Sequence, residues 1–378
     1  MEHAYCYNPA DMDTNQKQKS QFWAGMMVSL ICLAAIFFFI EPAEILAALE
    51  TARWGYLGLT AVGIILFLFI RAVRWRFMLN NDISLANTFH IQNIGYLVNN
   101  FLPLRLGDVA QAVLIGSVPP VTIARGLSTV VVTRILDMLF MVILLPLTLA
   151  SVETLPQQVQ STALVIGFLT TASVVVLVIA ANQRPLARKW ATAVFSWLAR
   201  LNQWLAARTA RIAWLSRVFT AVGRLNVAAW VNRIDDLLIG LSSLTSLKSG
   251  FILLITTILT WLPIIAAYYF GLLAVNLTPT PAMAGFVVCA AALSVAAPSS
   301  PGQIGVFHAG VIFALTTILG QPEGPSASFA FLYHAINLTT TTLLGIVGLL
   351  ATGATFRHVI DTTRQFANRS ENKPESLS

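Results

Sequence analysis

Long apolar runs alternate with short polar stretches along most of this chain. An α-helix needs about 20 predominantly apolar residues to cross the hydrocarbon core of a bilayer. Six runs have the length and character of full transmembrane helices: Phe22–Ile40, Gly55–Trp75, Leu127–Ala150, Ser161–Ala181, Gly250–Val275 and Phe329–Phe356. The pattern therefore predicts an all-α polytopic membrane protein that carries out its function inside the bilayer.

Two further stretches are interrupted. Ser84–Ser117 is half polar, whereas Pro281–Gly320 is apolar but contains a run rich in Pro, Ser and Gly. Proline and glycine both interrupt helices, so each stretch is predicted to be a broken-helix hairpin, either re-entrant or made of two short spans. The residues expected at the breaks are Pro103, Gly107, Pro298, Pro301 and Gly302.

Lys and Arg residues indicate the orientation, because they are enriched in cytoplasmic loops. They cluster after the second run, through residues 184–233 and after the last run, whereas the other loops carry mainly acidic residues such as Glu153 and Glu323. This distribution predicts a protein of the cytoplasmic membrane with both termini inside. It also requires the two interrupted stretches to enter from opposite faces.

The expected organisation follows from these assignments. A polar cytoplasmic tail (1–21) precedes a membrane domain (22–356), and a basic, polar cytoplasmic tail (357–378) follows it. Within the membrane domain we expect a first repeat at about 51–150, a basic loop at about 182–249 and a second repeat at about 246–356. Trp190, Trp197 and Trp204 recur at helical spacing in the loop, which predicts an interfacial helix; an ordinary basic linker is the alternative.

The repeat is suggested by laying the second half of the chain over the first without gaps. Gly55 then falls on Gly250, Asn81 on Asn276, Pro103 on Pro298 and Gly107 on Gly302. So few identities also arise by chance, but the opposite orientations deduced from charge agree with them. Inverted repeats with paired, interrupted helices are typical of secondary transporters, so alternating access across the membrane is the hypothesis.

Composition and charge support the membrane assignment. Of the residues, 57% are hydrophobic and 10% are charged, and the net charge is +7. The basic residues lie in short stretches between apolar runs, which favours contact with anionic lipid over binding of nucleic acid. The positions of the three cysteines do not indicate a disulfide framework. The first apolar run is interpreted as an uncleaved anchor, with a cleaved signal peptide as the alternative.

Two charged residues lie inside the third predicted span. Arg134 and Asp137 are roughly 10 and 15 Å from its start at Leu127. Burying a charge in the bilayer is costly, and the i, i+3 spacing places the two side chains on one helical face where they can pair. Either the pair is structural, or it lines a polar cavity in which Arg134 offers a planar fork to phosphate oxygens.

The segment Asn99–Asp108 is the densest polar motif. Its break would present backbone N–H groups suited to an anion, with Arg105 adding positive charge and Asn100 adding hydrogen bonds. Asp108 would serve as a counter-ion or proton site, like Asp137. A snorkelling surface loop is the alternative interpretation.

Histidines and interface residues complete the candidates. His90, His308 and His334 fall in membrane segments; each can be a packing residue, and His308 is the best candidate for proton coupling. Arg71, Arg74 and Trp75 end the second span and are interpreted as interface anchors. Phosphate-binding loops and metal-ligand motifs do not occur in the sequence, so we expect no cofactor and no metal.

At these motifs the chain resembles the lysylphosphatidylglycerol synthase transmembrane-region family, a flippase-like membrane domain. The resemblance covers about Phe22 to Phe356. It is carried by Arg71-x-x-Arg74-Trp75, Asn100-x-x-Pro103-x-Arg105-x-Gly107-Asp108, Arg134-x-x-Asp137 and Pro298-x-x-Pro301-Gly302-x-Ile304-Gly305.

The resemblance implies translocation of an anionic or amphiphilic lipid, such as an aminoacylated phospholipid or a polyprenyl-linked sugar. Asp108 stands where Glu is usual, Gln303 replaces a glycine, and His308 lies where an acid is expected, which puts shared coupling chemistry in doubt. The chain ends shortly after the last predicted span, so we expect a stand-alone member without the synthase domain.

The preferred hypothesis is a lipid translocator that works by alternating access, a transporter rather than an enzyme. Its partners would be membrane lipids, anionic or polyprenyl-phosphate-linked. A membrane-embedded transferase acting on a lipid phosphate is the first alternative, because it would use the same arginines. A non-catalytic membrane scaffold is the second.

Overall fold

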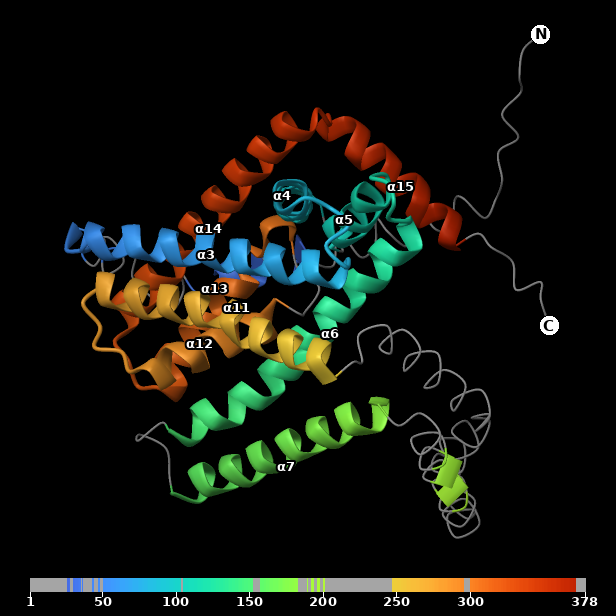
Figure 1. The fold of residues 1–378 in the computed structure, drawn as a ribbon. Coiled ribbons are helices and arrows are strands. Elements are labelled where there is room, and N and C mark those ends of the chain that lie inside the picture. Colours follow the sequence, from blue (N-terminus) through green and yellow to red (C-terminus); the bar gives the residue numbers. More distant parts are fainter. Residues whose placement is uncertain are drawn as a thin grey trace, which may run out of the picture. The chain divides into compact units, whose positions relative to one another are not determined.

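The computed structural model describes residues 51–102, 105–151, 157–182, 247–295 and 300–371, with scattered positions from 26 to 50 and from 189 to 200. Within these ranges every regular element is a helix, which confirms the predicted all-α class (Figure 1). The chain forms two compact units, one of Met1–Gly167 with Thr256–Ser378 and one of Phe168–Ile255. Apart from the first residues of α11 (Leu247–Ala274), the residues discussed below belong to the first unit.

Five helical stretches in the described ranges are long and apolar enough to cross a membrane. They are Trp54–Met78, Ile123–Ala150, Ser249–Ala274, Pro301–Ile318 and Glu323–Thr352. Four of them correspond to predicted full spans, and the fifth is the second limb of an interrupted stretch. The first predicted span, Phe22–Ile40, lies mostly outside the described residues, as does the predicted interfacial helix of the central loop.

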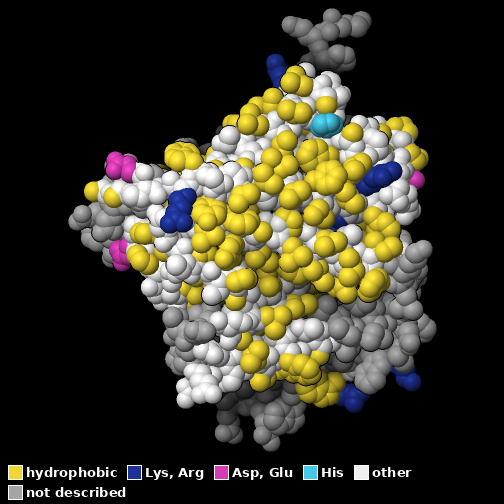
Figure 2. Space-filling view, turned by 60° about the vertical axis from the view of Figure 1, so that its left-hand side comes forward, with side chains coloured by type: hydrophobic (Ala, Val, Ile, Leu, Met, Phe, Trp, Pro, Cys, Tyr) yellow, Lys and Arg dark blue, Asp and Glu magenta, His cyan; other side chains and the backbone are white. Residues whose placement is uncertain are grey.

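The long helices expose apolar side chains. α3 (Trp54–Met78), α6 (Ile123–Ala150) and α11 (Leu247–Ala274) all carry exposed Leu, Ile or Val residues along their length. Figure 2 shows a face covered largely by hydrophobic side chains, with a few charged ones near its margins. Such a surface is unfavourable in water and matches the hydrocarbon of a bilayer. The protein is therefore a multi-pass membrane protein.

Both interrupted stretches are broken helices, as predicted. The first contains α4 (Leu85–Phe101) and α5 (Leu106–Gly116), which pack against each other. The second contains α12 (Pro281–Ser294), the 3₁₀ turn η1 (Pro301–Gln303), α13 (Val306–Phe313) and a π-helical turn, η2 (Ala314–Ile318). α12 packs against α13, so the second stretch is also a hairpin. Pro103 and Pro298 lie outside the described residues.

Gly107 does not form the first break. It lies in the first turn of α5, and the left-handed residue before that helix is Arg105, with φ 53°. A Cβ at Gly107 would overlap the Gly95 carbonyl oxygen and the Asn99 side chain. The glycine is therefore needed for the close approach of α5 to α4. In the second stretch Gly302 does lie at the break, with φ 69°.

The order of elements in the first half recurs in the second. α3 and α11 are each followed by a left-handed asparagine, Asn81 (φ 60°) and Asn276 (φ 61°). A capped helix comes next in each half, with Ser84 accepting from the backbone N–H of Asn87 at α4 and Thr280 capping α12 in the same way. Each half then continues with a break that contains a positive φ, a short helix (α5 or α13) and a long helix (α6 or α14, Glu323–Thr352). We call these two sets of helices the first and second series.

The last helix of each half packs against the first hairpin helix of the other half. α14 (Glu323–Thr352), from the second series, packs on α4 of the first, and Gly345 and Gly348 allow the close contact. Conversely, α6 of the first series packs on α12 of the second, where Gly285 faces Thr148. Figure 1 shows α14 passing over α4. Glycines at these crossings let helix backbones approach closely, which is the usual source of affinity between helices in lipid.

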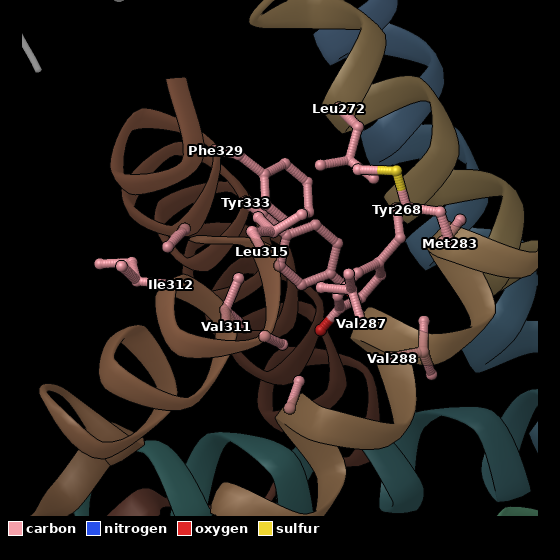
Figure 3. Close-up of a cluster of buried hydrophobic side chains, with 14 of the residues drawn as sticks. Tyr268, Leu272, Met283, Val287, Val288, Val311, Ile312, Leu315, Phe329 and Tyr333 are labelled. Atoms are coloured by element: carbon pink, nitrogen blue, oxygen red, sulfur yellow. The ribbon is translucent and has the colours of Figure 1, made fainter. Parts of the chain in front are cut away.

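The largest apolar core lies where α11, α12, α13, η2 and α14 meet. The rings of Tyr268 and Tyr333 are tilted against each other with their centroids 4.1 Å apart, and Phe329 packs beside both (Figure 3). Leu315 and Val287 are fully buried in the same cluster. This core fixes the second hairpin beside α14.

The C-terminal residues contain an additional helix. α15 (Phe356–Glu371) follows the left-handed Gly353 and packs on α5, with Val359 buried. The sequence pattern predicts a basic, polar tail from residue 357, so this helix is a difference from the prediction.

Candidate functional site

A buried carboxylate on α6 joins three long helices. Asp137 Oδ2 lies 2.6 Å from Arg71 Nη2, and Asp137 Oδ1 accepts a hydrogen bond from Arg74 Nη2 at 2.7 Å. Arg74 Nη1 also donates to Thr257 Oγ1 on α11 at 3.0 Å. The Arg74 side chain is completely buried. Because a lone buried charge is strongly unfavourable, these contacts hold α3, α6 and α11 together.

The interpretation of Arg71, Arg74 and Trp75 as interface anchors is wrong. All three side chains are buried within the protein, and Trp75 Nε1 donates to Thr129 Oγ1 on α6 at 3.0 Å. Arg71 and Arg74 are one helical turn apart on α3, so both guanidinium groups reach the same carboxylate. The end of an apolar run resembles an anchor in sequence, but this end of α3 is enclosed by α4 and α6.

Arg134 pairs with Asp108, not with Asp137. Arg134 Nε lies 3.0 Å from Asp108 Oδ2, and Nη2 lies 2.5 Å from Oδ1, so the contact is a two-point fork. Asp108 is in the first turn of α5, where a negative charge is favoured by the helix dipole. The predicted i, i+3 pair does not form because both aspartates have better partners on other helices. The two side chains stay partly exposed, at 28% and 20%.

Asn99 supports this fork, a role that the sequence pattern does not indicate. Its Oδ1 accepts a hydrogen bond from the backbone N–H of Gly107 at 2.8 Å, and its Nδ2 lies 3.5 Å from Asp108 Oδ1. The side chain thus caps α5 from the preceding helix. Capping rules look at neighbouring positions only, so a residue on the far side of the break gives no recognisable signal.

Arg105 joins the two helix breaks. Its Nη2 donates to the carbonyl oxygen of Val295, directly after α12, at 2.9 Å. A Cβ on Gly302 would lie 3.6 Å from the Asn100 carbonyl oxygen, so η1 also meets the end of α4. The residues around the two breaks are therefore in contact, although they are far apart in the sequence. Arg105 is an exposed residue, whereas Arg134 is partly buried and Arg71 and Arg74 are buried.

Asn100 is used in packing of α4 against α14. Its Nδ2 donates to Thr341 Oγ1 at 2.9 Å and to Thr342 Oγ1 at 3.1 Å. To donate a hydrogen bond to an anion, as predicted, Asn100 would have to give up one of these two hydrogen bonds.

Two histidines hold the second break. Gly305 donates its backbone N–H to His308 Nδ1 at 3.2 Å, and His334 Nε2 lies 2.8 Å from the carbonyl oxygen of Gly302. The two rings are 4.7 Å apart between centroids. As an acceptor, His308 Nδ1 cannot carry a proton while this bond exists. Protonation at that atom would break the contact that shapes the backbone beside Pro301 and Gly302.

The described charges around the first break do not balance. Arg71, Arg74, Arg105 and Arg134 face Asp108 and Asp137, which leaves a formal excess of two positive charges. We call these six residues the arginine cluster. Excess positive charge at a partly exposed site favours the binding of an anion.

A metal site is not evident in the parts of the chain that the structure describes. There, no three His, Cys, Asp or Glu side chains are grouped so that they could hold an ion.

Comparison with known proteins gives one family and one weak relative. The family described as "Lysylphosphatidylglycerol synthase TM region" matches residues 22–345. A "UPF0104 membrane protein" of Methanothermobacter thermautotrophicus is 23% identical over 112 residues, which is 29% of this chain and 34% of that protein. The match thus spans about a third of that relative's length. No solved structure matches the chain.

Proposed function

Because the chain belongs to the lysylphosphatidylglycerol synthase TM region family, we propose that it is a lipid translocator. It would move an anionic or polyprenyl-phosphate-linked lipid between the leaflets of the cell membrane by alternating access. The observation that carries this proposal is the arginine cluster, which has two excess positive charges beside the contact of two helix breaks. Charge of this kind inside a membrane protein is costly and is retained for function.

Arg134 and Arg105 would hold the lipid phosphate in sequence. Asp108 now occupies the fork of Arg134 with both carboxylate oxygens, and a phosphate presents oxygens of similar spacing. Exchange of the carboxylate for the phosphate would leave Asp108 as a displaced counter-ion. Arg105 donates a hydrogen bond to Val295 of the second hairpin, and it would bind the same phosphate at a later stage of transport.

The fold supports alternating access. The two series of helices exchange their long helices, since α14 packs on α4 and α6 packs on α12. Lysine and arginine placement would put the two hairpins on opposite faces of the membrane, with both chain termini in the cytoplasm. This would make the two series an inverted repeat whose breaks meet at the transport site. His308 and Asp108 would couple the movement to protons.

The direct test is lipid transfer in proteoliposomes. Purified protein is reconstituted in phosphatidylcholine vesicles that contain a fluorescently labelled lipid, and a membrane-impermeant reductant reports the fraction in the outer leaflet. We expect labelled phosphatidylglycerol or a polyprenyl-phosphate-linked sugar to exchange faster than labelled phosphatidylcholine. Mass spectrometry should recover the lipid unchanged, whereas a transferase would modify it. Exchange of every lipid at the rate of protein-free vesicles would contradict the proposal.

A further inference from the structure

We infer that His334 is the residue that takes up a proton at the second break, and that His308 takes one only when the break opens. The inference rests on the proposed function, which includes coupling to protons, and it adds His334 to the residues that carry the proton. Its basis is the way in which the backbone of the break fixes the hydrogen of each imidazole ring.

The backbone of the second break depends on its contacts. Gly302, Gln303 and Gly305 have φ angles of 69°, 61° and 87°. Glycine adopts such angles readily, but a residue with a side chain, such as Gln303, does so only where surrounding contacts hold it. The two histidines bond to the first and the last of these three residues, so they hold the break from both ends.

The carbonyl oxygen of Gly302 fixes the hydrogen of His334. A carbonyl oxygen can only accept, so the ring nitrogen 2.8 Å away, Nε2, carries a hydrogen and donates it. A neutral imidazole has one ring hydrogen, so Nδ1 of His334 has the lone pair. Within the described residues, this Nδ1 makes no hydrogen bond. A proton can therefore bind to Nδ1 while the bond to Gly302 stays intact, and the positive charge strengthens that bond.

The backbone N–H of Gly305 fixes His308 in the opposite way. This N–H can only donate, so Nδ1 of His308, 3.2 Å away, accepts with its lone pair, and the ring hydrogen lies on Nε2. Neither nitrogen of His308 can then bind a further proton. Protonation of His308 requires that the bond to Gly305 breaks first. A proton on His308 thus favours an open break, whereas a proton on His334 favours the break as it is described.

Aromatic packing keeps both rings in these orientations. Between centroids, the ring of His308 lies 4.4 Å from that of Phe331 and 5.7 Å from that of Phe307. The ring of His334 lies 5.1 Å from that of Phe307. Of the two histidines, His334 has the larger exposed fraction, 8% against 3%. The ring that can accept a proton is thus also the less buried one.

The pair carries one proton at a time. Its ring centroids are 4.7 Å apart, and two positive charges at that distance in a protein disfavour the second proton by a factor of about 100 or more. The carboxylates that form ion pairs in the described ranges do so with arginines, and neither ring takes part. Protonation of one histidine therefore keeps the other neutral.

The surrounding helices contribute other titratable groups. These residues are Tyr56, Arg71, Arg74 and Arg76 on α3, His90 and Tyr96 on α4, Tyr268 on α11, Cys289 on α12, and Glu323 and Tyr333 on α14. Arg71 and Arg74 are paired with Asp137. Glu323 begins α14 and lies roughly 16 Å along the helix axis from His334, so it does not replace a neighbouring counter-ion.

NMR of the full chain labelled with ring-¹⁵N histidine, in proteoliposomes, shows which ring nitrogens carry hydrogen. His308→Gln and His334→Gln assign the two sets of signals. His90→Gln is the matched control, because His90 Nδ1 has no hydrogen-bond partner in the described residues. Above the pH range in which histidine usually titrates, we expect hydrogen on Nε2 alone in both rings. As the pH falls to about two units below that range, His334 should gain a hydrogen on Nδ1 while His308 stays neutral.

Three NMR results would overturn the inference. They are hydrogen on Nδ1 of His334 in place of Nε2 at high pH, a second hydrogen on His308 before His334, and two rings that both stay neutral. If His334→Gln does not fold, comparison of wild type with His308→Gln still identifies the signals of His308, and the same three results decide.

Lipid transfer gives the second readout. His334→Gln can keep a donor to Gly302, because its amide nitrogen carries hydrogens, but it cannot bind a proton. We expect its transfer of labelled phosphatidylglycerol to rise more steeply than that of wild type as the pH falls, because only the histidine whose proton favours opening remains. His90→Gln should follow the wild-type profile.

The outcomes separate this inference from the proposed function. Equal pH profiles for wild type and His334→Gln would overturn the coupling role of His334 while the protein still acts as a translocator. Folded protein that moves no lipid, but shows the expected order of protonation, would contradict the proposed function and support the assignment of the proton to His334.

Discussion

Arg134 on α6 and Asp108 on α5 form a two-point ion pair, with 3.0 Å between Arg134 Nε and Asp108 Oδ2. The pair joins a long membrane helix to the helix that follows the first break. Its partial exposure distinguishes it from the enclosed contacts of Asp137. We interpret the first pair as exchangeable during transport and the second as a fixed connection between helices.

A double-mutant cycle measures the strength of the exchangeable pair. Arg134→Gln and Asp108→Asn should each lower the free energy of unfolding, and the double variant should lose less than the sum of the two. We expect a coupling of about 1 to 3 kcal/mol, because the pair is charged, forked and partly buried. Thermal unfolding in detergent gives the comparison. Strict additivity would show that the two side chains do not interact in the folded protein.

The fixed connection should be more sensitive to substitution. Asp137→Asn removes the negative charge that pairs with both Arg71 and Arg74, while both guanidinium groups remain buried. We expect a loss of about 3 kcal/mol or more in the free energy of unfolding. Arg125→Gln is the matched control, since its pair with Asp82 is about one-third exposed and should contribute less than about 1 kcal/mol. Equal losses would contradict the distinction.

His308 should stabilise the second break through its Nδ1 atom. His308→Ala removes the acceptor for the Gly305 N–H, and we expect a loss of about 1 kcal/mol from this hydrogen bond alone, with cavity effects in addition. His308→Gln places an amide oxygen at the third position of the helix, where Gln commonly accepts from the N-cap N–H, and should restore part of the stability. Since Gln does not titrate, the same variant should transfer lipid at a rate that depends less on pH than the wild-type rate does. A pH profile like that of wild type would exclude His308 as the proton-coupling residue.

The sequence predicted the apolar helices and both interruptions, because span length and Pro/Gly content are local properties. It did not predict the pairing of the charges. The i, i+3 spacing indicates a pair between Arg134 and Asp137 on one helix. Asp137 instead pairs with Arg71 and Arg74, which come close only because α3 packs on α6. The left-handed Arg105 and the capping by Asn99 likewise depend on how α4 and α5 fold back on each other. Tertiary contacts decided each of these points.

Membrane topology can be tested with single cysteines. On a background without Cys6, Cys32 and Cys289, Ser117→Cys after α5 and Glu323→Cys at the start of α14 should face opposite sides of the membrane; both positions are exposed. An impermeant maleimide should label Glu323→Cys in intact cells and Ser117→Cys only after permeabilisation. Labelling of both in intact cells would contradict the proposed orientation and the inverted repeat.

The most direct test of the central claim is the transfer rate of labelled phosphatidylglycerol by Arg134→Gln and Arg134→Lys, compared at equal amounts of folded protein. Glutamine keeps hydrogen bonding without charge, and lysine keeps charge without the planar fork. If the fork of Arg134 holds the lipid phosphate, Arg134→Gln should abolish protein-dependent transfer, Arg134→Lys should lose most of it, and Arg125→Gln should match wild type. Transfer at the wild-type rate by both Arg134 variants would show that the pair with Asp108 is structural and that lipid crosses elsewhere.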